Sequence, residues 1–128
     1  MGLLQEAERP PEIYSDGHLD LDFQRKVASL DSTRLQLTRK EYELLALLVR
    51  NAGEIVPRDA LLMRVWGYST EIRTRTLDVH IRRLRKKLGH YSEQYIETIF
   101  GIGYRFQPYR AQRPFQAFET PSLIAIGA

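Results

Sequence analysis

One segment of the chain, residues 75–88, most constrains the fold. Its apolar residues recur at helical spacing and form one narrow stripe: Leu77, Ile81, Leu84 and Leu88. Between Arg73 and Leu88 the chain has seven lysines or arginines and a single acid, Asp78. A solvated helix usually mixes the two charge signs, because opposite charges four residues apart attract each other. The segment therefore predicts a helix whose free face repels itself and favours an anionic partner.

The residues almost opposite the apolar stripe are mainly basic: Arg75, Val79, Arg82, Arg83 and Lys86. Thr76 and His80 are expected on one flank of the helix and Arg85 on the other. A helix fits the major groove of B-form DNA, where arginine and lysine bond guanine edges or phosphates. The alternative is a basic solvated face with no partner. A helix before this segment and a hairpin after it favour DNA, because two helices joined by a short loop form a helix-turn-helix.

The N-terminal part of the chain predicts a small antiparallel sheet. Leu19, Leu21 and Phe23 alternate with aspartates, a period of two that is typical of a half-buried strand. The other strands are expected at 13–14 on the sheet edge, at 27–30 and at 35–37. The aspartates of this region are expected on the solvated face: Asp16, Asp20 and Asp22.

Three helices and a hairpin are expected to follow the sheet. The first helix begins at Thr38, which has the capping-box spacing to Glu41, and stops at 51–53. A bridging strand, a second helix, a polar loop and the basic helix come next, at 55–56, 57–66, 68–74 and 75–88. After a short loop, strands at 95–99 and 104–107 enclose Gly101-Ile102-Gly103. This glycine pattern predicts a hairpin rather than a nucleotide-binding loop, because a strand and not a helix follows it.

Composition excludes several other classes of protein. The 128 residues suit one domain with one core. No apolar run approaches the roughly 18 residues of a membrane-spanning helix, and the N-terminus does not resemble a secretory signal. The chain has no cysteine, and its three histidines lack metal-ligand spacing, so we expect no metal and no cofactor. No nucleophile–base pair or phosphate loop is apparent, so we expect a protein that is not an enzyme. We also expect it to be cytoplasmic.

Three motifs occur in order along the chain. They are Leu-Thr-Arg-Lys-Glu-Tyr-Glu-Leu-Leu at 37–45, Val-Trp-Gly at 65–67 followed by Arg-Thr-Leu-Asp-Val-His-Ile-Arg-Arg-Leu-Arg-Lys-Lys-Leu at 75–88, and Gly-Ile-Gly-Tyr-Arg-Phe at 101–106. This combination strongly resembles the OmpR/PhoB family of response-regulator effector domains. The resemblance covers roughly 13–107. We therefore expect a linker or tail at 1–12, one domain at 13–107 and a C-terminal extension at 108–128 that is either disordered or packed on the domain.

The resemblance implies an α+β fold, a winged helix-turn-helix with an N-terminal four-stranded antiparallel sheet, a three-helix core and a C-terminal hairpin wing. It implies sequence-specific binding of double-stranded DNA in transcriptional regulation, as the output domain of a two-component response regulator that pairs head-to-tail on direct repeats. The resemblance and the charge pattern together give these candidate DNA-binding residues: Trp66, Arg73, Arg75, Thr76, Val79, His80, Arg82, Arg83, Arg85, Lys86, Thr98 and Tyr104. Thr98 and Tyr104 match phosphate contacts of the wing. A loop that contacts RNA polymerase in the family matches Gly67, Tyr68, Ser69, Thr70, Glu71 and Ile72.

The chain departs from the family pattern at three points. The receiver domain that normally precedes this module is absent, so the chain is either a fragment or a stand-alone regulator. Pro57 stands where the family often has a polar N-cap, which should shift the helix start slightly. Phe100 stands where an arginine usually reaches into the minor groove. We expect the Phe100 ring to fold inward against Ile102 or Tyr104, and the alternative is a ring that presses on sugars or wedges at a base step.

A second class of function stays open on the sequence alone. The same winged helix could use its basic face, or the loop before the basic helix, to bind protein without binding DNA.

Overall fold

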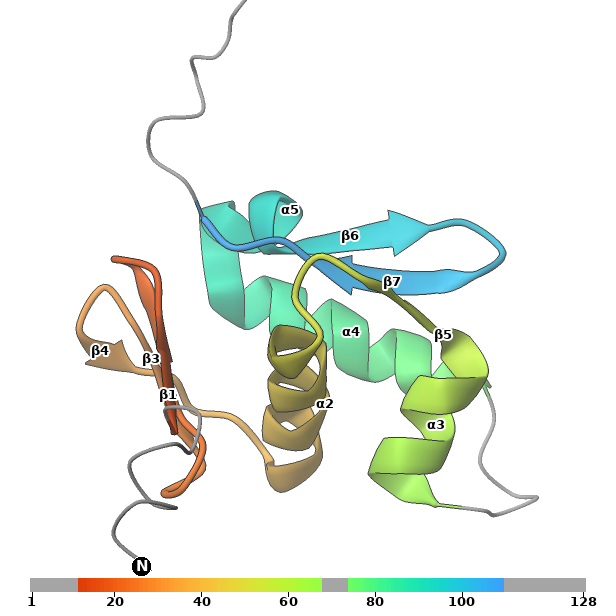
Figure 1. The fold of residues 1–128 in the computed structure, drawn as a ribbon, viewed down its shortest axis with the longest axis horizontal. Coiled ribbons are helices and arrows are strands. Elements are labelled where there is room, and N and C mark those ends of the chain that lie inside the picture. The colour runs from red at the N-terminus through yellow and green to blue at the C-terminus, as the bar shows by residue number, and fades with distance from the viewer. Residues whose placement is uncertain (1–11, 68–73, 110–128) are drawn as a thin grey trace, which may run out of the picture.

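The computed structural model describes residues 12–67 and 74–109, and these form an α+β fold (Figure 1). A four-stranded sheet lies at one end, three helices fill the middle and a hairpin lies beside the last of them. Side chains from the sheet, the helices and the hairpin share one hydrophobic core, in which Leu19, Leu45 and Phe106 are fully buried. The expected winged-helix architecture is confirmed.

The N-terminal sheet is antiparallel with the strands in chain order: β1 (Ile13–Ser15), β2 (Leu19–Asp22), β3 (Val27–Leu30) and β4 (Thr33–Arg34). The edge strand at Ile13 and the alternation in β2 are confirmed. The strand predicted at 35–37 is wrong, because the last strand is β4. Asp31 and Ser32 both adopt positive φ, of 50° and 69°, and so make a two-residue hairpin turn that starts the returning strand at once.

The first helix, α2 (Arg39–Arg50), begins as the sequence predicts. The Thr38 side chain accepts from the Glu41 N–H, and the Glu41 carboxylate accepts from the Thr38 N–H at 2.9 Å. This capping box satisfies two backbone donors that the first turn would leave free. Asn51 ends the helix, as expected.

The second and third helices of the core also match the expectation closely. Strand β5 (Ile55–Pro57) leads into α3 (Arg58–Trp66), so Pro57 is the N-cap and not a residue of the first turn. Gly67 ends α3 with a φ of 83°. The basic helix is α4 (Thr74–Leu88), which begins one residue before the predicted start.

The segment after α4 is more regular than the expected loop. It forms a 3₁₀ turn, η1 (Gly89–Tyr91), and one helical turn, α5 (Ser92–Tyr95). Tyr91 and Tyr95 lie four residues apart on the inner face and are buried, which fixes this turn against the core. The Tyr95 ring stacks on that of Phe106 with centroids 5.4 Å apart. Three polar residues separate the two tyrosines in the sequence, so the sequence pattern did not predict this helical turn.

The predicted hairpin is formed by β6 (Ile96–Ile99) and β7 (Gly103–Phe106), and β5 adds a third strand, in the order β5-β7-β6. Its two glycines serve different purposes. Gly101 has a φ of 78°, which the turn requires. Gly103 lies so close to β5 that a Cβ atom would stand 2.1 Å from the Val56 carbonyl oxygen. The hairpin interpretation of this glycine pattern is confirmed.

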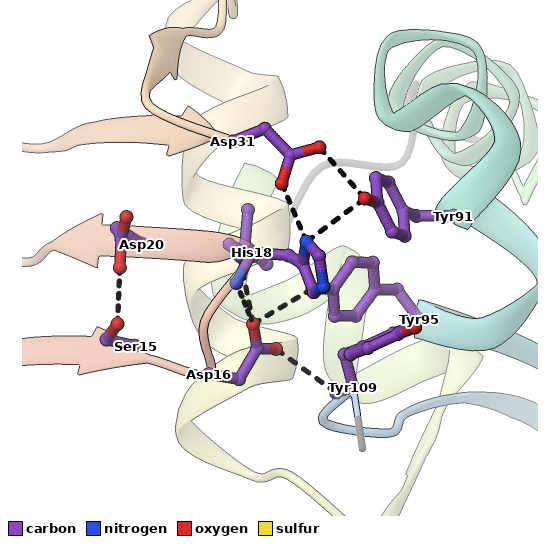
Figure 2. A network of polar contacts seen from close by, with 9 residues as sticks. Ser15, Asp16, His18, Asp20, Asp31, Tyr91, Tyr95 and Tyr109 are labelled. Atoms are coloured by element: carbon purple, nitrogen blue, oxygen red, sulfur yellow. Dashed lines mark hydrogen bonds and ion pairs between the residues drawn. The ribbon is translucent and has the colours of Figure 1, made fainter. Parts of the chain in front are cut away.

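The described domain extends two residues past the predicted end at 107. The Tyr109 N–H donates to Asp16 at 3.1 Å, and its ring packs edge-on against His18 with centroids 4.4 Å apart (Figure 2). Asp16 also accepts from the Tyr14 hydroxyl at 2.6 Å and from the Tyr95 hydroxyl at 3.0 Å. Asp16, which was expected on a merely solvated face, therefore joins the N-terminal sheet to the C-terminal end of the domain.

The remainder of the expected linker and C-terminal extension, residues 1–11 and 110–128, lies outside the described residues. Among the described residues, no helix is long and apolar enough to cross a membrane. No group of three or more potential ligands in those same residues could hold a metal ion.

Candidate nucleic-acid interface

The apolar stripe of α4 lies in the core, as the sequence predicts. Its four residues are at most 1% exposed: Leu77, Ile81, Leu84 and Leu88. Because a helix turns by 100° per residue, this buried stripe fixes the direction of every other side chain on α4. Two flanks and one free face follow from it.

One flank of α4 faces the hairpin. Arg85 Nη2 donates to the Ile96 carbonyl at 2.9 Å and to the Thr98 hydroxyl at 2.7 Å. Nearer the N-terminus of α4, the Asp78 carboxylate accepts from the Tyr104 hydroxyl at 2.9 Å and from Arg58 at 2.7 Å. These bonds hold both strands of the hairpin at a fixed position beside α4.

The opposite flank of α4 faces the other two helices. The His80 ring packs edge-on against the Trp66 ring, with centroids 4.9 Å apart, and His80 Nδ1 donates to the Thr76 carbonyl at 2.8 Å. Lys87 Nζ lies 2.7 Å from the Glu41 carboxylate, which is 1% exposed. Burial raises the pKa of Glu41, but the hydrogen bonds from Lys87 and from the Thr38 N–H outweigh it, so the pKa lies below its ordinary value.

The free face of α4 is cationic. Its exposed side chains are Arg75, Arg82, Arg83 and Lys86, and Val79 lies half-buried among them. In the described part of the chain, no carboxylate pairs with any of these four cations. From Arg75 to Lys86 the face is about 16 Å long at 1.5 Å per residue. A helix face of this length and charge fits the major groove and its phosphate rims.

The expected site residues thus separate into two sets. The structure brings the larger set together on or beside the free face: Arg75, Thr76, Val79, His80, Arg82, Arg83 and Lys86. The remaining described candidates already have partners within the chain, since Arg85 bonds Thr98, Tyr104 bonds Asp78 and Trp66 packs on His80. Burial, with the bond to Asp78, raises the pKa of Tyr104, whose side chain is buried. Contacts of these residues with DNA stay predictions.

Some of the candidates lie where the structure says nothing of them. Arg73 and the expected polymerase-contact residues 68–72 are outside the described residues. Gly67, the first residue of that loop, is described as the C-cap of α3, with its N–H bonded to the Met63 carbonyl at 2.8 Å.

Two basic residues have roles that the sequence did not reveal. Lys87 and Arg58 face Glu41 and Asp78, respectively, across helix contacts. Lys87 was counted in the basic segment, but its angular position lies over the N-terminus of α2 rather than on the free face. Helical phase shows on which flank of its helix such a residue lies. It does not show the partner, because Glu41 is 46 residues from Lys87 in the chain and Asp78 is 20 residues from Arg58.

The expected inward fold of Phe100 is wrong. The Phe100 side chain is 89% exposed at the hairpin tip. The Ile102 N–H donates to the Ile99 carbonyl at 2.9 Å, which closes a tight turn and places Phe100 at its corner. Tyr104 is itself buried, with the guanidinium groups of Arg58 and Arg85 at 5.9 and 5.7 Å from its ring centroid, and the Phe100 ring does not cover it.

Comparison with known proteins places this arrangement in a family. Residues 32–106 match the family model described as the C-terminal domain of transcriptional regulatory proteins. The chain belongs to this family. It is an effector domain of the OmpR/PhoB type: DrrB of Thermotoga maritima, described as an OmpR/PhoB homologue, is 33% identical with a TM-score of 0.70, over 82% of this chain and 48% of DrrB.

Two further relatives support the assignment. The DNA-binding domain of Klebsiella pneumoniae RstA, solved in complex with the RstA box, is 33% identical with a TM-score of 0.68, over 77% of this chain and 99% of that domain. The response regulator ArlR of Staphylococcus saprophyticus is 44% identical over 59% of this chain. The match covers 35% of ArlR, so this effector domain spans about a third of the length of such curated relatives.

Proposed function

We propose that this effector domain binds double-stranded DNA in a sequence-dependent manner, with α4 in the major groove, as the output domain of a two-component response regulator. The free face of α4 carries this proposal, because four neighbouring cations without a carboxylate partner in the described residues repel one another and so favour an anionic partner. Membership of a family of transcriptional regulators supports it. The family consists of DNA-binding regulators and not of enzymes.

Affinity and specificity are divided along the helix. Arg82 and Arg75 lie toward the hairpin, and Arg83 lies toward the opposite flank, with Val79 and Lys86 between them. Cations on the flanks of an inserted helix reach phosphates, whereas side chains of its free face can reach base edges. Arg83 and Val79 belong to the free face and point farther from the buried stripe than Arg85 does, so we expect these two residues to select bases. We expect the remaining cations to supply affinity that is independent of sequence.

We propose three further features on the family resemblance. Two copies pair head-to-tail on direct repeats, the loop that begins at Gly67 contacts RNA polymerase, and the domain acts in the cytoplasm. Pairing on direct repeats requires a DNA partner, and the DNA-binding domain of the relative RstA was solved in complex with the RstA box.

The test is selection of bound sites from random duplexes, followed by titration of the recovered duplex at two or more salt concentrations. The log–log slope of affinity against salt should be about −4, because four exposed cations lie on α4. Arg83→Ala should relax the selected base preference and cost about 1–3 kcal/mol on the best site. Arg25→Ala, which removes an exposed arginine from the turn between β2 and β3, is the matched control and should change neither quantity.

Two results would contradict DNA binding. A flat salt response would show that α4 does not neutralise phosphates. Equal affinity for an acidic protein of similar charge would support the alternative, a winged helix that binds protein only.

A further inference from the structure

A second cationic surface lies where the N-terminal sheet meets α2 and the end of α3, and Figure 1 shows α2 between these two elements. Two hollows adjoin there, of about 380 and 370 Å³, and both are lined by Lys26, Tyr42 and Glu43. The first hollow extends along residues 34–39, and the second extends along α2 to Arg64 of α3. Because the hollows share these lining residues they form one groove, which we call the α2 groove.

The exposed residues that line the α2 groove form its rim, which is mainly cationic. Basic side chains come from the turn before β3, from β4, from both ends of α2 and from α3: Lys26, Arg34, Arg39, Arg50 and Arg64. Among the described lining residues Glu43 is the single carboxylate, and two neighbouring cations already bond it, at 3.2 and 3.4 Å. In the described part of the chain, no carboxylate pairs with Lys26, Arg34 or Arg64. The rim therefore keeps a positive charge that favours an anionic partner.

The floor of the α2 groove is apolar. Its half-buried apolar side chains come from the sheet, from the segment before α2 and from α2 itself: Phe23, Val27, Leu35, Leu37 and Leu47. Tyr42, which is buried, lines both hollows, and its hydroxyl donates to the Asp22 carbonyl at 3.3 Å. Half-buried apolar area gains affinity when the apolar groups of a partner displace water from it. Cations above an apolar floor thus favour a partner with carboxylates and apolar side chains together.

The α2 groove opens on the side of α2 that faces away from α4. Lys87 of α4 meets α2 at Glu41, with the two charged groups 2.7 Å apart. At 100° per residue, Arg39, Glu43 and Arg50 lie roughly opposite Glu41 on the helix. A partner in the α2 groove therefore leaves the free face of α4 open, and both surfaces can be occupied at once.

We propose that the α2 groove binds an extended acidic segment of a partner protein, in which carboxylates alternate with apolar side chains. Successive side chains of an extended chain point to opposite sides, so the apolar ones face the floor while the carboxylates stay level with the exposed cations. A DNA duplex fits this surface less well. It is too broad to enter the hollows and would leave the apolar floor in water.

The experiment titrates the full chain against a fluorescent hexapeptide of alternating glutamate and leucine and follows the anisotropy of the dye. Lys26→Glu reverses the cation shared by both hollows and should weaken binding by about tenfold or more, and Arg34→Glu should weaken it by about fivefold. A hexapeptide of glutamate alone should bind at least about fivefold more weakly than the alternating peptide, because it leaves the floor uncovered.

A matched control lies next to Lys26 in the same turn. Arg25 is 82% exposed and does not line either hollow, so Arg25→Glu should bind the peptide as the wild type does. The combined change Arg82→Glu and Arg83→Glu removes charge from the free face of α4. It should abolish duplex binding and preserve peptide binding.

Three results would overturn the proposal. The wild-type chain could fail to bind the alternating peptide, Lys26→Glu and Arg34→Glu could both bind it like the wild type, or binding could be lost in the α4 variant instead. The proposed function is tested separately, by titration with the selected duplex, which Lys26→Glu should bind with unchanged affinity. If the wild type binds the peptide but no duplex, the proposed function fails and the α2 groove stands.

Discussion

Arg85 Nη2 donates to the Thr98 hydroxyl over 2.7 Å, and this bond joins α4 to the hairpin. Both residues were candidates for contact with DNA, but the structure directs them toward each other. The same guanidinium reaches the Ile96 carbonyl, so it bridges two residues of β6. Arg85 therefore acts on the position of the hairpin, whatever it contributes to phosphate binding.

Thr98→Val tests this role without altering charge. Valine keeps the branched shape and removes the hydroxyl acceptor, at a cost to stability of about 1 kcal/mol. We expect affinity to fall by up to about fivefold on all duplexes alike, with an unchanged salt slope, because the hairpin loses its fixed position and no cation is lost. Fluorescence titration on the selected duplex and on a scrambled one measures both quantities. A change in the ranking of base sequences would show instead that Thr98 lies at a base-reading contact.

The sequence predicted the fold and the free face of α4 because both depend on local periodicity. The positions of Leu77, Ile81 and Leu84 fix the helical phase, and the phase identifies the exposed cations. It does not identify which cations on the flanks have partners, because Glu41 lies 46 residues from Lys87 in the chain. The direction of Phe100 was also beyond the sequence, since it depends on the turn that the Ile102 N–H closes with the Ile99 carbonyl.

Lys87→Met should lower the free energy of unfolding by about 3 kcal/mol, because it leaves the buried Glu41 carboxylate without its cation. The value lies at the low end of the usual range, since the Lys87 side chain is 34% exposed. Urea unfolding at neutral pH measures it. The neighbouring change, Lys86→Met, is the matched control. It removes a cation of the free face, so stability should change by less than about 0.5 kcal/mol while DNA binding weakens.

Combining Lys87→Met with Glu41→Gln should restore most of the lost stability. Glutamine keeps the capping box with Thr38 and removes the charge that lysine no longer balances. Equal stability of Lys87→Met and the wild type would show that the pair contributes nothing to folding.

Gly103→Ala should destabilise the domain by about 2 kcal/mol or more through overpacking. The added Cβ atom would lie 2.1 Å from the Val56 carbonyl oxygen and 2.9 Å from Pro57 Cα, and backbone atoms cannot turn away as a side chain would. Strands β5 and β7 must therefore separate. Gly101→Asn is the comparison, because nothing lies within 4 Å of its Cβ position and asparagine tolerates positive φ. Thermal unfolding that affects both variants equally would contradict the close approach at Gly103.

The last prediction concerns the stability of the domain in acid, and it follows from Asp16. Burial raises the pKa of this carboxyl, but hydrogen bonds from the Tyr14 hydroxyl and from backbone N–H groups, that of Tyr109 among them, outweigh it, so the pKa is lowered. A carboxyl with a lowered pKa in the folded state stabilises that state above its unfolded pKa of about 3.9. This contribution is lost as the pH falls through the lowered value.

Asp16→Asn should therefore reduce stability at neutral pH, by about 1–3 kcal/mol, and reduce the further loss of stability below about pH 4. Tyr14→Phe should give an intermediate result, because it removes one donor to Asp16 and keeps the ring that packs edge-on against Phe106. Urea unfolding at a series of pH values from 7 to 3 gives the free energy for each variant. An acid dependence of Asp16→Asn parallel to that of the wild type would show that the link between the N-terminal sheet and Tyr109 does not depend on the charge of Asp16.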